Sequence, residues 1–167
     1  MGETKRKQSQ TKQELDEKLR LSTPSRDVLE DLAVACAKDP SPDHTFQYAF
    51  ALSKSNQATE LRYAVTILDG LVKEGYVHEM DCWYAAATAL YLLGDYDEAR
   101  FRCENMLRTK PDSRIASELH LACIESQELK QEQQLQQAAV GGTIALAALG
   151  VLAGVASVMM SSSSKKK

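Results

Sequence analysis

The chain has 167 residues, with 20 Lys and Arg against 23 Asp and Glu, and a formal net charge of −3 at pH 7. This small acidic excess, with no basic face interleaved with aromatic residues, gives no indication of nucleic-acid binding. The 4 cysteines are widely spaced and form no CxxC pair. In a reducing cytosol they are therefore expected to be small buried apolar residues rather than disulfides or metal ligands.

The N-terminal part of the chain is polar. Residues 1–12 are predicted to be disordered, and residues 13–21 are predicted to form a short helix whose apolar side chains are leucines. Thr23 and Pro24 then give a helix start signal, a capping hydroxyl followed by proline at the first helical position. This helix is predicted to end before Pro40.

The next part of the chain reads as helix after helix, with no convincing strand. Further helices are expected at residues 43–55, 59–74, 78–93 and 96–109, with a last one from residue 112. Residues 13–126 amount to one domain. A glutamine-rich juxtamembrane segment, residues 127–137, follows it.

An internal period indicates the kind of helical stack. The 34-residue tetratricopeptide repeat carries a first-helix Trp, a turn Gly, a Tyr, a small Ala and a closing Pro, and the same offsets hold Trp83, Gly94, Tyr96, Ala99 and Pro111. Trp83 is expected to fill the gap between the two helices of a hairpin, and Gly94 to permit the tight turn. Ala99 lets the helices cross closely, and Pro111 ends the unit.

A degenerate copy of this repeat covers residues 46–75, where Tyr48 and Ala64 stand 35 residues before their counterparts. Two repeats leave apolar faces exposed, so the helices before and after them are expected to cap the ends. The predicted fold is an all-α, tetratricopeptide-like bundle of about six helices, followed by one C-terminal transmembrane helix.

The first helix of each repeat is expected to line a concave groove for a partner. By the geometry of the repeat, the groove-facing positions are Ala49, Ser53, Asp81, Tyr84, Thr88 and Tyr91. Tyrosines in a shallow groove are good anchors for a partner's helix or extended peptide. The alternative is that Tyr84 and Tyr91 simply pack against neighbouring helices.

The stretch from Ala138 to Met160 carries no charge. As a helix it would be about 34 Å long, enough for a hydrocarbon core of about 30 Å. It is predicted to be a transmembrane tail anchor, because the alternative, a buried core helix, would normally show a polar face. Gly150 and Gly154 form a small-xxx-small pair that would permit self-association.

A short basic tail, residues 161–167, follows the anchor and ends in Lys165, Lys166 and Lys167. The positive-inside rule alone would place these lysines in the cytosol. The N-terminus offers no signal peptide, however, so we expect the helical domain to face the cytosol. A weakly hydrophobic anchor with a basic tip favours the mitochondrial outer membrane, with peroxisomes as a second candidate.

This arrangement of a repeat pair, capping helices, anchor and basic tip resembles the mitochondrial fission protein 1 family. Residues 46–55 resemble the family's first-repeat helix, with its aromatic-x-Tyr-Ala start and Ser ending, and residues 64–71 resemble the partner helix. The second repeat and the glycine-bearing residues 140–154 match as well. The resemblance covers roughly residues 40–160, whereas residues 1–23 do not resemble the family arm.

The resemblance implies an adaptor on the outer mitochondrial membrane, and often on peroxisomes, rather than an enzyme. Such proteins help to recruit a dynamin-type GTPase to sites of division, directly or through a bridging protein. It also implies that an N-terminal arm can fold over the groove and compete with partners. Leu15, Leu19 and Leu21 are the side chains available for that contact here. No cofactor is implied, because the partner would supply any GTP hydrolysis.

A tail-anchored chaperone receptor with a tetratricopeptide clamp is the main alternative. Its groove would need Lys, Arg and Asn on the first helices, but residues 78–93 contain no Lys or Arg. Leu90, Gly94 and Asp95 also match the core of a BH3 segment, although Gly94 is already explained as a turn glycine. An enzyme is the least supported class, because the histidines lie far apart and no P-loop or nucleophile elbow is present.

Overall fold

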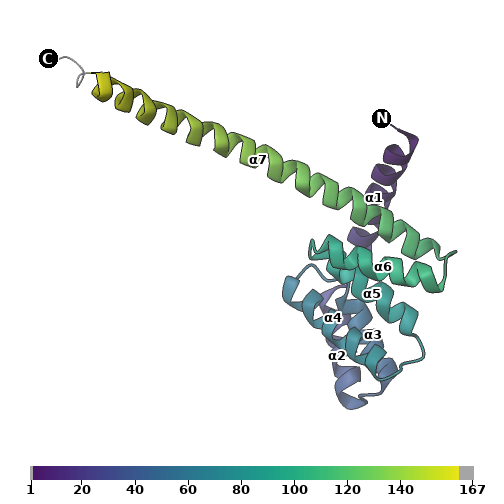
Figure 1. Ribbon diagram of the computed structural model, residues 1–167. Coiled ribbons are helices and arrows are strands. Elements are labelled where there is room, and N and C mark those ends of the chain that lie inside the picture. The colour runs from purple at the N-terminus through teal and green to yellow at the C-terminus, as the bar shows by residue number, and fades with distance from the viewer. Residues whose placement is uncertain (1, 162–167) are drawn as a thin grey trace. The chain divides into compact units, whose positions relative to one another are not determined.

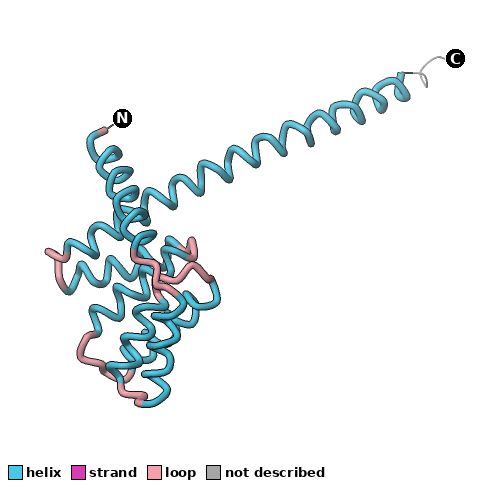
Figure 2. Tube along the Cα trace, turned by 180° about the vertical axis from the view of Figure 1, so that it is seen from behind, coloured by secondary structure: helices cyan, strands magenta, loops and turns pink. Residues whose placement is uncertain are grey.

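The computed structural model describes the backbone of residues 2–161 and the side chains of residues 2–139. Over this part of the chain every regular element is a helix (Figure 1; Figure 2), which confirms the all-α prediction. The chain divides into two units, residues 1–127 and residues 128–167. In chain order the helices are α1 (Glu3–Leu21), α2 (Arg26–Lys38), α3 (Pro42–Leu52), α4 (Ala58–Lys73), α5 (Glu79–Leu92), α6 (Tyr96–Thr109) and α7 (Arg114–Ser161).

Capping residues explain where the early helices begin. Ser25 caps α2, because its Oγ accepts a hydrogen bond from the backbone N of Val28 at 3.4 Å. α2 therefore begins two residues later than the Thr23 signal predicts. Ser41 caps α3 in the same way, and Pro42 follows it at the first helical position.

The predicted disorder of residues 1–12 is wrong, because α1 begins at Glu3. Most of its residues are Lys, Arg, Glu, Gln and Leu, which are strong helix formers even where apolar residues are few. Two of its leucines are buried against the rest of the unit, so tertiary packing also supports the helix. The polar composition that suggested disorder is that of a helix with one narrow apolar face.

Two helical hairpins form the centre of residues 1–127. α3 packs on α4 and α5 on α6, while α4 packs on α5 and joins the two pairs. α2 packs on α3 at one end, and at the other end Leu119 and Cys123 of α7 join Cys103 of α6 in a buried cluster. This is a tetratricopeptide-like arrangement of two repeats with a flanking helix on each side.

Two glycines reverse the chain within the repeats. Gly94 has a φ of 77° in the turn between α5 and α6, where the backbone N of Asp95 donates to the carbonyl oxygen of Leu90 at 3.0 Å. Gly75, which the repeat pattern did not single out, has a φ of 76° in the turn between α4 and α5. A residue with a Cβ atom is strained at these angles, so both turns favour glycine.

The remaining repeat residues lie around the α5–α6 hairpin. Ala99 is fully buried, as close helix crossing requires. Tyr96, the first residue of α6, is half-buried and packs against Tyr91, with ring centroids 5.5 Å apart and the rings tilted by 56°. Trp83 is half-buried beside α6, and Pro111 follows the end of α6 as an exposed residue.

The predicted membrane anchor lies largely outside the side chains that the structure describes. The backbone of α7 continues to Ser161, and Ala138 is exposed. Among the described residues, no helix has the length and hydropathy that a membrane span requires. Gly150, Gly154 and Met160 lie outside the residues whose side chains are described, and Lys165, Lys166 and Lys167 lie outside the described residues altogether.

Candidate partner-binding site

Tyr84, Thr88 and Tyr91 lie along one side of α5, at the spacing that the groove prediction used. Thr88 and Tyr91 are buried, whereas Tyr84 is half-buried. The Tyr91 hydroxyl donates to Oδ1 of Asp16 in α1 at 2.6 Å and accepts from Oγ of Ser126 in α7 at 3.3 Å. Tyr91 is therefore enclosed by neighbouring helices, as the alternative interpretation holds, and only Tyr84 retains exposed surface.

α1 meets this side of α5 at Tyr91. Leu15 and Leu19 are only 4% and 6% exposed, and they belong to the same buried cluster as Ala87 and Tyr91. Leu21 is 71% exposed and takes no part in the contact. The side of α5 formed by Tyr84, Thr88 and Tyr91 is called the α5 stripe below. Of the three leucines expected in an N-terminal arm, the structure buries two beside this stripe.

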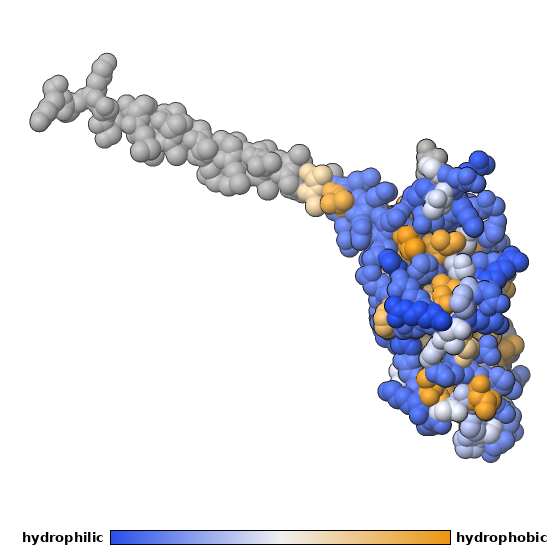
Figure 3. All heavy atoms as spheres, turned by 45° about the vertical axis from the view of Figure 1, so that its right-hand side comes forward, coloured by the Kyte–Doolittle hydropathy of each residue, from blue (hydrophilic) through white to orange (hydrophobic). Residues whose placement is uncertain are grey.

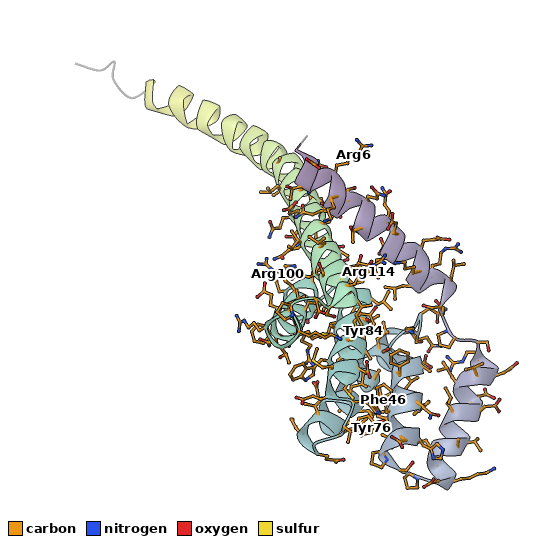
Figure 4. All side chains as sticks on the ribbon, turned by 90° about the vertical axis from the view of Figure 1, so that its right-hand side faces the viewer. Arg6, Phe46, Tyr76, Tyr84, Arg100 and Arg114 are labelled. Atoms are coloured by element: carbon orange, nitrogen blue, oxygen red, sulfur yellow. The ribbon has the colours of Figure 1, made fainter. Side chains whose placement is uncertain are left out.

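Charged residues fix the direction of α1 along α7. Nζ of Lys5 lies 2.6 Å from Oε2 of Glu125, and Nζ of Lys18 lies 3.3 Å from Oε2 of Glu118. The two helices therefore run antiparallel here, as the view in Figure 4 shows. Hydrogen bonds from Arg114, and then from Lys18, hold the pKa of Glu118 below its ordinary value of 4.5. Burial, together with the hydrogen bond to Asp16, raises the pKa of Tyr91.

Ala49 and Ser53, the groove positions predicted on α3, are fully buried. The Ser53 hydroxyl donates to the carbonyl oxygen of Phe50 at 2.7 Å, so it is satisfied within its own helix. α2 packs on α3, where Sγ of Cys36 lies 3.7 Å from Oγ1 of Thr45. The prediction is wrong for Ala49 and Ser53, because these small residues allow close helix packing instead of lining an open surface. It also fails for Thr88 and Tyr91, which are both buried.

An aromatic strip that the sequence analysis missed lies on α3 and the α4–α5 turn. Its members are Phe46, Phe50 and Tyr76, all half-buried. The ring centroid of Phe46 lies 5.5 Å from those of both Phe50 and Tyr76. Nζ of Lys54 lies 4.2 Å from the centroid of the Phe50 ring. The four-residue spacing of Phe46, Phe50 and Lys54 was the available signal, because such residues share one face of a helix.

Among the described residues, no cluster of His, Cys, Asp and Glu could hold a metal ion. Asp81, the last predicted groove residue, is exposed and lies 3.7 Å from the His78 ring. The candidate site therefore consists of Tyr84, the aromatic strip and the α5 stripe under α1.

Comparisons with known proteins assign the family. No family model matches the chain. The mitochondrial fission 1 protein of Eremothecium gossypii is 30% identical to it over 135 residues, which are 80% of this chain and 84% of the relative. The mitochondrial fission 1 protein of Rattus norvegicus is 30% identical over 123 residues, 73% of this chain and 76% of the relative. The chain belongs to the mitochondrial fission 1 family.

A solved structure of the family shares the fold. The crystal structure of yeast Fis1 in complex with an Mdv1 fragment superimposes with a TM-score of 0.59 at 21% identity, and it covers 69% of this chain and 94% of the other. The family resemblance drawn from residues 46–55 and the second repeat is thus confirmed. This member of the mitochondrial fission 1 family therefore carries its candidate site on a tetratricopeptide-like fold.

Proposed function

We propose that this chain is an adaptor of mitochondrial fission that recruits a dynamin-type GTPase, directly or through a bridging protein. The observation that carries the proposal is the burial of Leu15 and Leu19 of α1 in one cluster with Ala87 and Tyr91 of α5, because this side of α5 thereby accepts the apolar side chains of a helix. Family membership supports the role in fission. The solved complex of yeast Fis1 with an Mdv1 fragment supports a partner that is itself an adaptor. The chain itself would carry out no reaction.

In this proposal α1 competes with the partner for the α5 stripe. Burial of Leu15 and Leu19 stabilises the contact by roughly 1.5–3 kcal/mol for each side chain. The conformational entropy of ordering α1 opposes this gain. The Lys18–Glu118 pair adds little, because the Lys18 side chain is largely exposed. A partner with a larger apolar face would therefore displace α1.

The packing between α1 and α7 is also incomplete. A hollow of about 360 Å³ lies between them, lined by Lys7 and Thr11 on one side and by Arg114 and Leu121 on the other. The side chains of α1 and α7 make fewer direct contacts where this hollow lies, so α1 is expected to separate first in this region.

A membrane anchor at residues 138–160 completes the mechanism. Anchoring concentrates many copies of the groove on one surface, so that weak contacts act together on a multimeric partner. We place the anchor in the mitochondrial outer membrane, with residues 13–126 in the cytosol and the peroxisomal membrane as a second location. The basic tail that ends in Lys167 then lies on the far side of the membrane.

The location of the chain tests the membrane part of the proposal. Full-length protein with an N-terminal fluorescent tag is expected to ring mitochondria, and a chain that ends at Gln137 is expected to be diffuse. Loss of the gene is expected to elongate the mitochondria. Full-length protein on the endoplasmic reticulum, with mitochondrial shape unchanged, would instead support a tail-anchored chaperone receptor.

Recruitment of the GTPase to isolated mitochondria tests the groove. Tyr84→Ala is expected to reduce the amount of GTPase that sediments with the mitochondria, because Tyr84 is the stripe residue with exposed surface. Tyr63→Ala is the matched control, since Tyr63 is 55% exposed on α4 outside the candidate site. Equal recruitment by both variants would refute the assignment of the groove.

A further inference from the structure

A second hollow opens where the start of α3 meets the turn between α4 and α5. Its volume is about 410 Å³, within the range of ligand pockets. The start of α3 contributes Pro42 and Asp43 to its lining, and the last turns of α4 contribute Leu71 and Glu74. Neither α1 nor α7 lines it, so it is separate from the α5 stripe.

The wall of this hollow is held in place before any partner binds. Oη of Tyr76 donates to Oδ1 of Asp43 at 2.7 Å, and the Tyr76 ring lies 5.5 Å from Phe46 and 5.4 Å from His78 between centroids. The turn itself is fixed by the positive φ of Gly75. A preformed wall loses little conformational entropy on binding.

The hollow combines an apolar floor with an unusually exposed apolar rim. Leu71 is 4% exposed at the floor. Val77, at the rim, is 84% exposed, more than any other large apolar side chain among the described residues. The face shown in Figure 3 carries only small, separate hydrophobic patches on a mostly hydrophilic surface. An apolar side chain placed here by a partner would cover both Leu71 and Val77.

The charge around the hollow is acidic. Asp43 and Glu74 are its only ionisable lining residues besides Tyr76, and neither forms an ion pair with Lys or Arg among the described residues. Glu79 and Asp81 follow the rim in the first turn of α5. Lys73, next to Glu74 in the chain, is the nearest basic side chain in sequence. Carboxylates that form no ion pair within the chain attract Lys and Arg on a partner.

We propose that this hollow docks an apolar side chain of a partner segment in which that residue is flanked by Lys and Arg. The apolar side chain packs on Leu71 and Val77, and the flanking cations lie against Asp43 and Glu74. The site extends the partner-binding surface beyond the concave groove and does not depend on displacement of α1.

Nuclear magnetic resonance of the full chain, purified at constant detergent concentration, tests this site. The probe is the acetylated, amidated peptide GKRLRKG, which is expected to shift the amide signals of Gly75, Tyr76 and Val77 in a saturable way. Val77→Lys adds an opposing charge at an exposed position, and we expect it to weaken binding by about three- to tenfold. Val77→Glu removes the same apolar group but adds a charge that does not repel the peptide. The Val77→Glu variant is therefore expected to bind the peptide at least about three- to tenfold more tightly than Val77→Lys.

Three controls decide the outcome. Peptide GKRGRKG lacks the apolar anchor and peptide GEDLDEG reverses the charges, so neither should produce the saturable shifts. Val34→Lys makes the same change at a half-exposed position of α2 outside the hollow and should leave binding unchanged. The proposal is overturned if a control peptide binds as tightly as GKRLRKG, or if Val34→Lys weakens binding as much as Val77→Lys.

Discussion

Replacing Leu19 by Ala is expected to release α1 while the repeats stay folded. Leu19 is 6% exposed and packs in the cluster that joins α1 to α5. The substitution removes three buried carbon groups at about 0.8 kcal/mol each, or about 2.4 kcal/mol in total. Since about 1.4 kcal/mol changes an equilibrium tenfold, the open form of α1 should become roughly 50 times more populated.

Amide hydrogen exchange measures this opening directly. The protection of the α1 amides should fall by roughly 50-fold in Leu19→Ala, and the protection of α4 and α5 should remain. Leu21→Ala is the matched control, because Leu21 is 71% exposed and its loss should change protection by less than about twofold. The reasoning is refuted if the two variants lose equal protection in α1. It is equally refuted if Leu19→Ala lowers protection in α5 as much as in α1, since α1 would then open only with the whole unit.

Further predictions concern the turn, the buried hydroxyl and one carboxylate. Gly94→Ala should lower the free energy of unfolding in urea by about 1–2 kcal/mol because of its positive φ. Gly70→Ala in α4, whose added Cβ would meet nothing within 4 Å, should raise it by up to about 1 kcal/mol. A loss in both variants would show that local packing decides instead of φ. Tyr91→Phe removes the bond to Asp16 and should lower α1 protection by about tenfold, with unchanged protection as the contradicting result. Glu118 has a lowered pKa, so its stabilising contribution is complete above pH 4.5 and is lost as pH falls through its folded pKa. Glu118→Gln should therefore flatten the fall in stability below pH 4.5, measured by urea unfolding at several pH values, and an unchanged slope would contradict this.

The sequence predicted the repeat region well because its signals are local. α6 begins at Tyr96 and ends at Thr109, as predicted, because the turn glycine before it and the proline after it stand next to the helix ends. The start of α1 was missed because one of its tertiary contacts joins Lys5 to Glu125, and nothing near Lys5 in the chain reports that pairing. Helix propensity was the only local signal for the start of α1. The polar composition of residues 1–12 outweighed that signal and led to the prediction of disorder.

The candidate site was predicted less well, for a geometric reason. The offsets that placed Tyr84 on the groove side were transferred to Ala49 and Ser53, which assumes that both repeats have the same neighbours. α2 packs on α3, whereas the buried cluster beside α5 includes side chains of α1 and α7, so equivalent positions meet different surroundings. Which side chains remain exposed depends on the flanking helices, and the repeat pattern carries no information about them.

If a partner replaces α1, as proposed above, the contacts of α1 indicate which side chains that partner presents. Once α1 leaves, the Tyr91 hydroxyl loses its acceptor and the buried Glu125 carboxylate loses its cation. A competitor that binds in the same direction as α1 and satisfies both groups in the same way would present two apolar residues four apart and a carboxylate directly after the first of them. It would also present a cation about ten residues before that first apolar residue, as in the order Lys5, Leu15, Asp16, Leu19. Under the proposed competition, this order of residues in α1 is a pattern with which partner sequences can be searched.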